Sequence, residues 1–143
     1  PLDYVPFAHL LAAARFAISD SGGIQEEAPA LGTPVLVTRE TTERGEGVEA
    51  GTLRLVGTDP ATIADAAHEL LSDNGAHQAM AFAENPYGDG RAASRVVAAL
   101  ENLAGFGPAP ERYGSGFNRT RVLVAGGYPE PSTLRLPITA DAR

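Results

Sequence analysis

Apolar residues recur at two different spacings along the first sixty residues, and the two spacings alternate. Residues 4–14 repeat apolar side chains at the spacing of a helix, and "RFAIS", residues 15–19, is a short apolar run typical of a buried strand. The segment "IQEEAPAL" predicts a helix that ends at Gly32, and "PVLVT", residues 34–38, predicts a second buried strand. After a polar loop over 39–51, the segment "TLRLVG" predicts a third strand.

The strongest helical pattern of the chain comes next. In "TDPATIADAAHELLSD", Thr58 or Asp59 suits the N-cap and Pro60 suits the first helical position. A helix around 76–84 follows, then the turn cluster "NPYGDG" and a last helix over 91–103. The two longer helices each carry one apolar stripe, made of Ile63, Ala67, Leu70 and Leu71 in the first and Val96, Val97, Leu100 and Leu103 in the last.

This order of elements predicts the fold class. Short buried strands that alternate with helices form a parallel sheet with helices on both faces, so we expect a Rossmann-like α/β domain. Ligands in such folds bind beyond the carboxyl ends of the strands. The segments "SDSGG" and "RETTERGEG" both follow predicted strands, and they are therefore the candidate ligand loops.

Charge and glycine content divide the chain near Gly105. Residues 1–104 carry 15 acidic residues and 6 arginines, whereas residues 105–143 carry 3 and 5. The second part also holds 6 glycines and 5 prolines in 39 residues, a density typical of chains without packed structure. We expect one folded domain over 1–104 and a disordered or loosely packed tail, in which only residues 121–126 have a strand pattern.

Composition also limits the partners and the location. A formal net charge of −7 argues against a broad nucleic-acid surface, and no apolar run is long enough to span a membrane. The chain has no cysteine, which excludes disulfides and thiolate metal sites and suits the cytoplasm. Because it opens on Pro1 rather than methionine, we expect a processed chain or a piece of a longer one.

The turn formed by Ser21, Gly22 and Gly23 is a candidate phosphate site. It lies where a strand passes into a helix, so its backbone N–H groups and the positive end of the helix dipole can face an anion. Glycine allows a diphosphate to approach the backbone closely, and the serine hydroxyl can donate a further hydrogen bond. A purely structural turn is an equally good interpretation of so short a motif.

Charged side chains near this turn each allow two interpretations. We expect Glu26 and Glu27 in the first helical turn, where the dipole favours acids in any protein; one of them can instead accept hydrogen bonds from ribose hydroxyls. Arg39 and Arg44 either form ion pairs within an acidic, solvated loop or bind a diphosphate. We expect His68 and His77 on the surface of helices, and the histidines show no metal-like spacing and no catalytic triad.

Four segments together resemble a known family. They are "PLDYVPFAHLL", "SDSGGIQEEAPALGTPVLV", "RETTERGEGVEAGTLRLVGTD" and "NPYGDGRAASRVV", and in this order they resemble the C-terminal half of the non-hydrolysing UDP-N-acetylglucosamine 2-epimerases. The resemblance runs from about residue 1 to 103. It implies a two-domain fold like the GT-B glycosyltransferases, in which this chain is the half that holds UDP.

The resemblance also implies a reaction and a set of partners. The family interconverts UDP-GlcNAc and UDP-ManNAc by eliminating UDP to give 2-acetamidoglucal and adding it back after protonation of C2 from the other face. The implied chemistry needs no cofactor and no metal. The implied partners are UDP-GlcNAc or UDP, the missing N-terminal half and a second copy in a homodimer. The implied role of the complete enzyme is in polysaccharide biosynthesis.

Site residues follow from the resemblance by position. Glu27, rather than Glu26, would bind the ribose, and Arg44 would steady the departing diphosphate. Phe7 and the backbone around Leu2 match positions that line the uracil pocket, although core packing in the first helix is an equally good interpretation of Phe7. The implied UDP site as a whole comprises Leu2, Phe7, Ser21, Gly22, Gly23, Glu27 and Arg44.

Two differences from the family pattern affect these expectations. Gly45 replaces a proline and Gly47 replaces a bulkier residue, so we expect a more mobile Arg44 loop. The residues that the family uses for proton transfer belong to the N-terminal half, so no catalytic residue is assignable here and we predict that the isolated chain is inactive. The alternatives are a GT-B glycosyltransferase, which should lack "TTERxE" and "NPYGDG" together, and a non-catalytic UDP-binding module.

Overall fold

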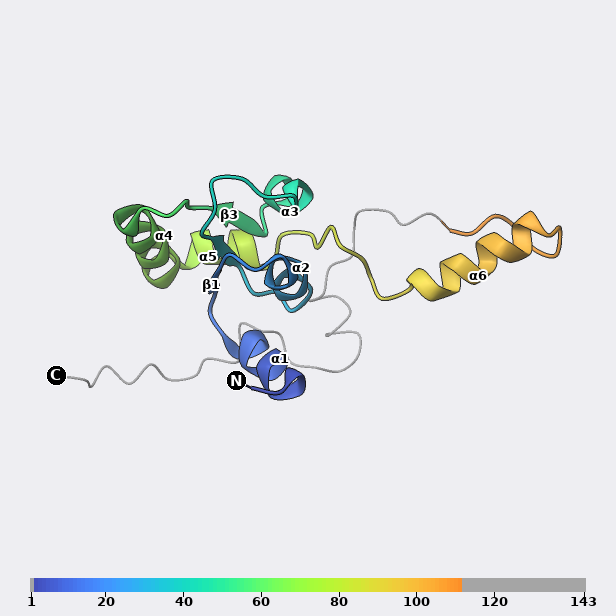
Figure 1. The fold of residues 1–143 in the computed structure, drawn as a ribbon, viewed down its shortest axis with the longest axis horizontal. Helices are drawn as coiled ribbons and strands as arrows, with labels where there is room; N and C mark the ends of the chain where they lie inside the picture. Colours follow the sequence, from blue (N-terminus) through green and yellow to red (C-terminus); the bar gives the residue numbers. More distant parts are fainter. Residues whose placement is uncertain (1, 112–143) are drawn as a thin grey trace.

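Three short parallel strands form the centre of the molecule in a computed structural model that describes residues 2–111 (Figure 1). The strands β1 (Ala17–Ser19), β2 (Val35–Val37) and β3 (Leu53–Leu55) lie side by side in the order β1-β2-β3. Helix α2 (Gly22–Ala30) connects the first two strands and helix α3 (Gly45–Ala50) connects the second and third. The first of these connections is the helix that the hydrophobic pattern predicts, whereas α3 lies within the predicted polar loop.

The side chains of β2 alternate between the two faces of the sheet, and all are fully buried. Val35 and Val37 belong to one apolar cluster, whereas Leu36 belongs to another. The first cluster is completed by Leu11, Ala28 and Leu53, and the second by Val56, Ala66, Leu70 and Met80. Both faces of the sheet are therefore covered, and the prediction of a Rossmann-like α/β class is confirmed.

Helices from both ends of the domain cover these two faces. Helix α1 (Tyr4–Ala13) contributes Leu11 to the first cluster, while α4 (Pro60–Ser72) and α5 (Asn74–Ala81) contribute to the second. The start of α4 is as predicted, because the Asp59 side chain accepts a hydrogen bond from the Thr62 N–H at 2.8 Å. The α5 helix begins and ends a few residues before the predicted range.

Arg15 joins the covering helices to β1. Its Nε donates to the Leu70 carbonyl at 2.8 Å, near the C-terminal end of α4. A positive charge at this end of a helix interacts favourably with the helix dipole. The carbonyl of Arg15 accepts a 2.7 Å hydrogen bond from Nε2 of His77 in α5. His68 and His77 both lie in helices as predicted, and His68 is exposed, whereas the ring of His77 is half-buried and bonded to the chain before β1.

Two segments are less buried than the sequence suggests. The run "RFAIS" predicts a buried strand, yet β1 lies at the edge of the sheet and Ile18 is 48% exposed. The apolar stripe of α1 is also incomplete, since Tyr4 and Leu10 are exposed and only Leu11 is fully covered. Apolar periodicity predicted both elements correctly but did not predict how much of each the described residues cover.

The segment 39–51 is not the continuous polar loop that the sequence predicts. Its second half is the helix α3, which follows Arg44 and is terminated by the C-cap residue Gly51, with a φ of 85°. Gly47 was expected to loosen this segment, but it is buried, and a Cβ placed on it would overlap the Tyr87 hydroxyl and lie 2.6 Å from Cδ1 of Leu53. Gly47 is therefore a position of close packing between α3, β3 and the "NPYGDG" turn.

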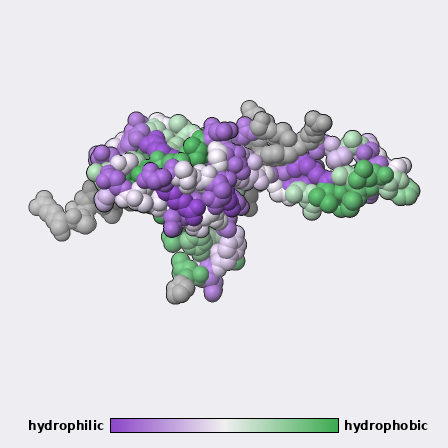
Figure 2. Space-filling model, turned by 45° about the horizontal axis from the view of Figure 1, so that its top comes forward, coloured by the Kyte–Doolittle hydropathy of each residue, from purple (hydrophilic) through white to green (hydrophobic). Residues whose placement is uncertain are grey.

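Helix α6 (Ala92–Leu103) extends away from the sheet (Figure 1). Its predicted boundaries are correct within a residue, but it has no buried residue, and its whole apolar stripe is exposed. Figure 2 shows this stripe as a continuous hydrophobic surface on the part of the molecule that projects from the body. The stripe comprises Val96, Val97, Leu100 and Leu103, with Phe106 beyond the end of the helix.

The predicted tail lies mostly outside the described residues. Residues 105–111 contain no helix or strand, and residues 112–143, including the predicted strand at 121–126, are not among those described. A domain boundary near Gly105 remains a prediction. Within residues 2–111, no helix combines the length and the apolar character that a membrane crossing requires.

Candidate functional site

The turn "SDSGG" lies at the carboxyl edge of the sheet, as predicted. Ser21 is the N-cap residue of α2, and the first helical hydrogen bond runs from the Gln25 N–H to the Ser21 carbonyl at 3.2 Å. The N–H groups of Gly22, Gly23 and Ile24 precede this bond, so the helix itself supplies no acceptor for them. Together with the helix dipole they form a place that favours an anion.

Polar side chains surround both glycines of this turn at close range. A Cβ placed on Gly22 would lie 3.4 Å from Nη2 of Arg44 and 3.5 Å from Oε1 of Glu43. A Cβ on Gly23 would lie 3.8 Å from Oε1 of Glu27 and 3.9 Å from Oγ of Ser21. Neither glycine has a positive φ, so the backbone conformation does not require glycine here. The absence of a side chain instead leaves the backbone open to close approach by a ligand.

The structure therefore brings together five residues of the predicted UDP site. Ser21, Gly22, Gly23 and Glu27 all belong to the start of α2, and Arg44 reaches them from the segment that follows β2. The parallel register pairs Ser19 with Val37, so the two segments leave the sheet at the same edge.

Arg44 has two carboxylate partners. Its Nε donates to Oε1 of Glu26 at 2.6 Å, and its Nη2 lies 2.6 Å from the same oxygen. Its Nη1 lies 2.9 Å from Oε1 of Glu43. The hydrogen bond to Glu26, followed by the charges of Glu26 and Glu43, raises the pKa of Arg44. The guanidinium is thus a fixed cation beside the glycine turn.

Glu26 and Glu27 have different partners, which the sequence alone did not predict. Helix α2 begins at Gly22, so the expectation that these acids occupy its first turn is wrong and a simple dipole role does not explain them. Glu26 binds Arg44, whereas Glu27 lies beside Gly23. The charge of Glu27 and a hydrogen bond to its carboxylate raise the pKa of the exposed Tyr4 phenol at the start of α1.

A second set of contacts holds the backbone at Arg44. The hydroxyl of Thr42 donates to Oε1 of Gln25 at 2.6 Å, and it accepts a hydrogen bond from the Arg44 N–H at 3.1 Å. Gln25 is fully buried within α2. Two consecutive residues of α2 therefore hold Arg44. Gln25 acts on the backbone of Arg44 through Thr42, and Glu26 binds its side chain.

Sequence reasoning missed Tyr4, Gln25, Thr42 and Tyr87 as neighbours of this site. Burial raises the pKa of Tyr87 to about 12, and the charges of Glu46 and Glu26 act in the same direction, so its phenol stays neutral. A glutamine inside a short helix after a glycine turn was a usable signal for Gln25. No sequence signal pointed to Tyr87, because its contact with Gly47 joins segments about forty residues apart.

Phe7 and Leu2 are placed less decisively. Phe7 is half-buried and packs against the first apolar cluster, which supports its interpretation as a core residue. Leu2 is exposed ahead of α1. A role of either residue in a uracil pocket remains a prediction.

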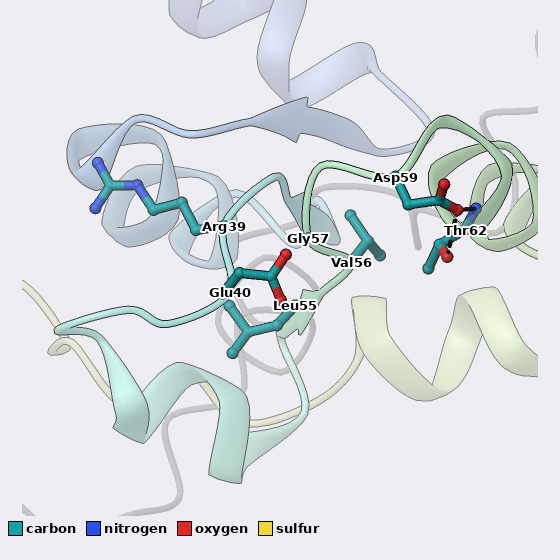
Figure 3. A pocket seen from close by; sticks show the side chains of 7 residues that line it. All are labelled: Arg39, Glu40, Leu55, Val56, Gly57, Asp59 and Thr62. Carbon is teal, nitrogen blue, oxygen red and sulfur yellow. Dashed lines mark hydrogen bonds between the residues drawn. The ribbon is translucent and has the colours of Figure 1, made fainter.

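A hollow of about 450 Å3 lies at the carboxyl ends of β2 and β3 (Figure 3). Glu40 points into it toward Gly57, and Asp59 is turned to the Thr62 N–H at the start of α4. Arg39 borders the hollow and pairs with Glu43 at 3.2 Å. Its carboxylates make it a poor anion site, and within residues 2–111 no group of histidine and acidic residues could hold a metal ion.

Comparison with known proteins agrees with this geometry. The family model described as UDP-N-acetylglucosamine 2-epimerase matches residues 1–101. The chain belongs to this family. The UDP-N-acetylglucosamine 2-epimerase of Escherichia coli K12 is 57% identical over 102 residues, which are 71% of this chain and 27% of that protein.

Solved structures of the family contain the same fold. The UDP-GlcNAc 2-epimerase of Neisseria meningitidis bound to UDP-GlcNAc is 47% identical, with a TM-score of 0.67 over 71% of this chain and 28% of that one. An S. aureus protein solved with UDP is 45% identical, with a TM-score of 0.73 over 80% of this chain and 32% of that one. The predicted family resemblance is confirmed, and the chain spans about a quarter of the length of the curated relatives it matches.

Proposed function

We propose that this chain is the UDP-holding part of a UDP-N-acetylglucosamine 2-epimerase. The observation that carries the proposal is the position of Arg44, whose Nη2 lies 3.4 Å from the Cβ position of Gly22 at the open start of α2. Backbone N–H groups, a helix dipole and one guanidinium converge there, and this combination favours a diphosphate. Two structural relatives were solved with UDP or UDP-GlcNAc bound, which supports the same ligand class.

In this proposal the remaining assigned residues bind the rest of the nucleotide. Glu27 lies next to Gly23 and accepts hydrogen bonds from the ribose hydroxyls. Leu2 lies just before α1 and Phe7 lies within it, and in this proposal both border the uracil. The same helix contacts Glu27 through Tyr4. Ser21 adds a hydroxyl donor to the diphosphate.

The activity proposed for the complete enzyme is the interconversion of UDP-GlcNAc and UDP-ManNAc. UDP leaves by elimination, 2-acetamidoglucal forms, and UDP adds back after C2 is protonated from the other face. Arg44 and the start of α2 stabilise the negative charge that develops on the departing diphosphate. Groups that move the protons belong to the part of the enzyme outside this chain, so purified chain should not turn over UDP-GlcNAc.

The proposed partner of this chain is the rest of the epimerase. The exposed stripe of α6 supports it, because an apolar helix face without a covering layer marks an interaction surface. The stripe is within or next to the family match, which ends at residue 101. The proposal also includes a cytoplasmic location and a homodimeric state of the complete enzyme. It further divides the chain into a folded unit over 1–104 and a separate tail over 105–143.

The proposal is tested by titrating UDP into the purified chain by calorimetry or NMR. We expect saturable binding with a Kd on the order of millimolar, about −4 kcal/mol, because only one side of the ligand is covered. Arg44→Ala and Glu27→Ala should each weaken it. Arg54→Ala is the matched control, since Arg54 also forms an exposed ion pair, with Glu69, but outside the site.

Binding that is unaffected by Arg44→Ala would overturn the assignment of the diphosphate. If the unaltered chain does not bind UDP, addition of the remaining part of a 57% identical relative in trans should restore binding. Failure of that complemented sample to bind UDP would overturn the proposed function as a whole.

A further inference from the structure

The two carboxylates on Arg44 hold different edges of its guanidinium. Glu26 contacts Nε and Nη2 on the side of the group, through one oxygen at 2.6 Å from each. Glu43 contacts Nη1 at its end, at 2.9 Å. The guanidinium atom nearest to the glycine turn is Nη2, 3.4 Å from the Cβ position of Gly22, and this is an atom that Glu26 holds.

Glu26 is anchored to the same element as the anion site. It belongs to α2, the helix whose first N–H groups face the turn, so an arginine bound to it stays fixed relative to those groups. Its neighbour Gln25 is fully buried and acts through Thr42 on the Arg44 backbone. Both contacts hold Arg44 with its Nη2 beside the turn.

Glu43 differs from Glu26 in exposure and in position. Its side chain is 56% exposed, against 45% for Glu26, and it lies in the connecting segment before α3 rather than in a helix. Its Oε1 is 3.5 Å from the Cβ position of Gly22, which is where an anion bound to this turn would stand. A hydrogen bond from its own backbone N–H, then Arg39 and Arg44, lowers the pKa of Glu43, so the carboxylate is charged near neutral pH.

We propose that Glu26 is a positioning residue that holds Arg44 over the glycine turn, and that Glu43 is an internal competitor whose carboxylate the diphosphate of the ligand displaces. This inference rests on the proposed function, since it assigns roles around the same diphosphate site. Glu26 stays bound to the side of Arg44 when the ligand arrives. Glu43 leaves the end of Arg44 and turns toward Arg39, its other partner at 3.2 Å.

The proposal predicts opposite effects from two chemically identical substitutions. Glu26→Gln and Glu43→Gln each remove one negative charge next to Arg44, so general repulsion of the diphosphate decreases in both variants. Removal of the competitor in Glu43→Gln should strengthen UDP binding about two- to fivefold, as expected for a partly exposed ion pair. Loss of the anchor in Glu26→Gln should weaken binding about three- to tenfold.

The experiment measures UDP and inorganic pyrophosphate affinities of the full chain and these variants by calorimetry, with thermal unfolding as a check on the fold. A double-mutant cycle with Arg44→Ala distinguishes an effect that acts through Arg44 from a general effect on the structure. In the Arg44→Ala background the two glutamine substitutions should no longer have opposite effects, because each then acts only by removing a negative charge. The difference between the two backgrounds measures the coupling of each carboxylate to Arg44. Pyrophosphate should follow the same order as UDP, since both roles concern the diphosphate alone.

A readout in the ligand-free protein keeps this proposal separate from the proposed function. The Arg44 Nε–H should give a slowly exchanging signal in the 1H–15N spectrum, identified by its loss in Arg44→Lys. This signal should disappear in Glu26→Gln and persist in Glu43→Gln. Equal affinities for the two glutamine variants, or weaker binding after Glu43→Gln, would overturn the competitor role.

The remaining outcomes also decide the question. A protected Nε–H that survives Glu26→Gln would overturn the positioning role, whether or not UDP binds. If no sample binds UDP, the proposed function and the competitor role both fail, while the spectrum still judges Glu26. If the unaltered chain binds UDP but the cycle shows no coupling to Arg44, the proposed function stands and this inference fails.

Discussion

Helices α4 and α6 have similar apolar stripes in the sequence but different surroundings in the structure. Leu70 of α4 is completely buried in the second apolar cluster, whereas Leu100 of α6 is 61% exposed. The first helix lies on a face of the sheet, and the second extends beyond it (Figure 1). The period of apolar residues therefore predicts a helix with one apolar face. Whether that face is buried depends on which other elements pack against it.

The ends of the two helices differ in the same way. The Asp59 side chain caps α4, but Arg91 precedes α6 without a side-chain hydrogen bond to the helix. An ion pair between Asp89 and Arg95 instead fastens the first turn of α6, with two contacts of 2.6 Å. Helix α4 is therefore held by packing and a cap, and α6 by its connection to the "NPYGDG" turn.

Truncation of one leucine in each stripe should give the largest difference. Leu70→Ala removes a fully buried side chain and should lower the free energy of unfolding by about 2–5 kcal/mol. Leu100→Ala should change it by less than about 0.5 kcal/mol, because its side chain is already exposed. Urea unfolding followed by circular dichroism measures both, and similar losses in the two variants would remove the distinction between the helices.

A methyl group at Gly47 tests whether the segment before α6 is fastened to the body. Gly47→Ala places a Cβ against the Tyr87 hydroxyl and Leu53, and it should lower the free energy of unfolding by about 1–3 kcal/mol through overpacking. Gly45→Ala is the matched control in the same helix, since nothing lies within 4 Å of its Cβ position. If both alanine variants are as stable as the unaltered chain, Tyr87 does not anchor this turn.

Acid titration should reveal the cap on α4. Hydrogen bonds from the Thr62 N–H and hydroxyl lower the pKa of Asp59 below its usual 3.8. The unfolded chain therefore takes up this proton first, so the stability that the cap contributes is present above pH 3.8 and decreases as the pH falls through the folded-state pKa. Asp59→Asn keeps a capping side chain without titration, and it should show a smaller loss of thermal stability between pH 5 and about pH 3.

Removal of the ion pair at the start of α6 should have the smallest global effect. Asp89→Asn eliminates a carboxylate whose pKa is held below its ordinary range by hydrogen bonds from Arg95. Since α6 buries none of its residues, the midpoint of global unfolding should hardly move, while amide hydrogen exchange in α6 becomes faster. Exchange that is equally fast before and after the substitution would show that this pair does not hold the helix.

Much of the fold was predictable because its signals are local. Apolar runs gave the strands, Pro60 and Asp59 gave the start of α4, and Gly32 gave the end of α2, where it adopts a φ of 70°. Helix α3 was missed because "GEGVEA" is polar and contains two glycines. The exposure of Ile18 and of α6 was missed because burial depends on neighbours that a sequence pattern does not specify.

The candidate site was predictable to a similar extent. The glycine turn, Glu27 and Arg44 could be assigned from their positions after strands and from the family resemblance, and the structure brings them together. The pairing of Glu26 with Arg44 joins residues eighteen positions apart and leaves no periodic signal. Long-range side-chain contacts of this kind are the part of the site that only the folded chain reveals.

We propose that the diphosphate binds at the start of α2, beside Arg44. The most direct measurement is a map of 1H–15N chemical-shift changes as UDP is added to the chain. We expect the largest changes at the amides of residues 21–24 and 42–44, with little change at residues 57–62, which border the hollow at the ends of β2 and β3. Changes centred on residues 57–62, with none at Gly22 and Gly23, would contradict it.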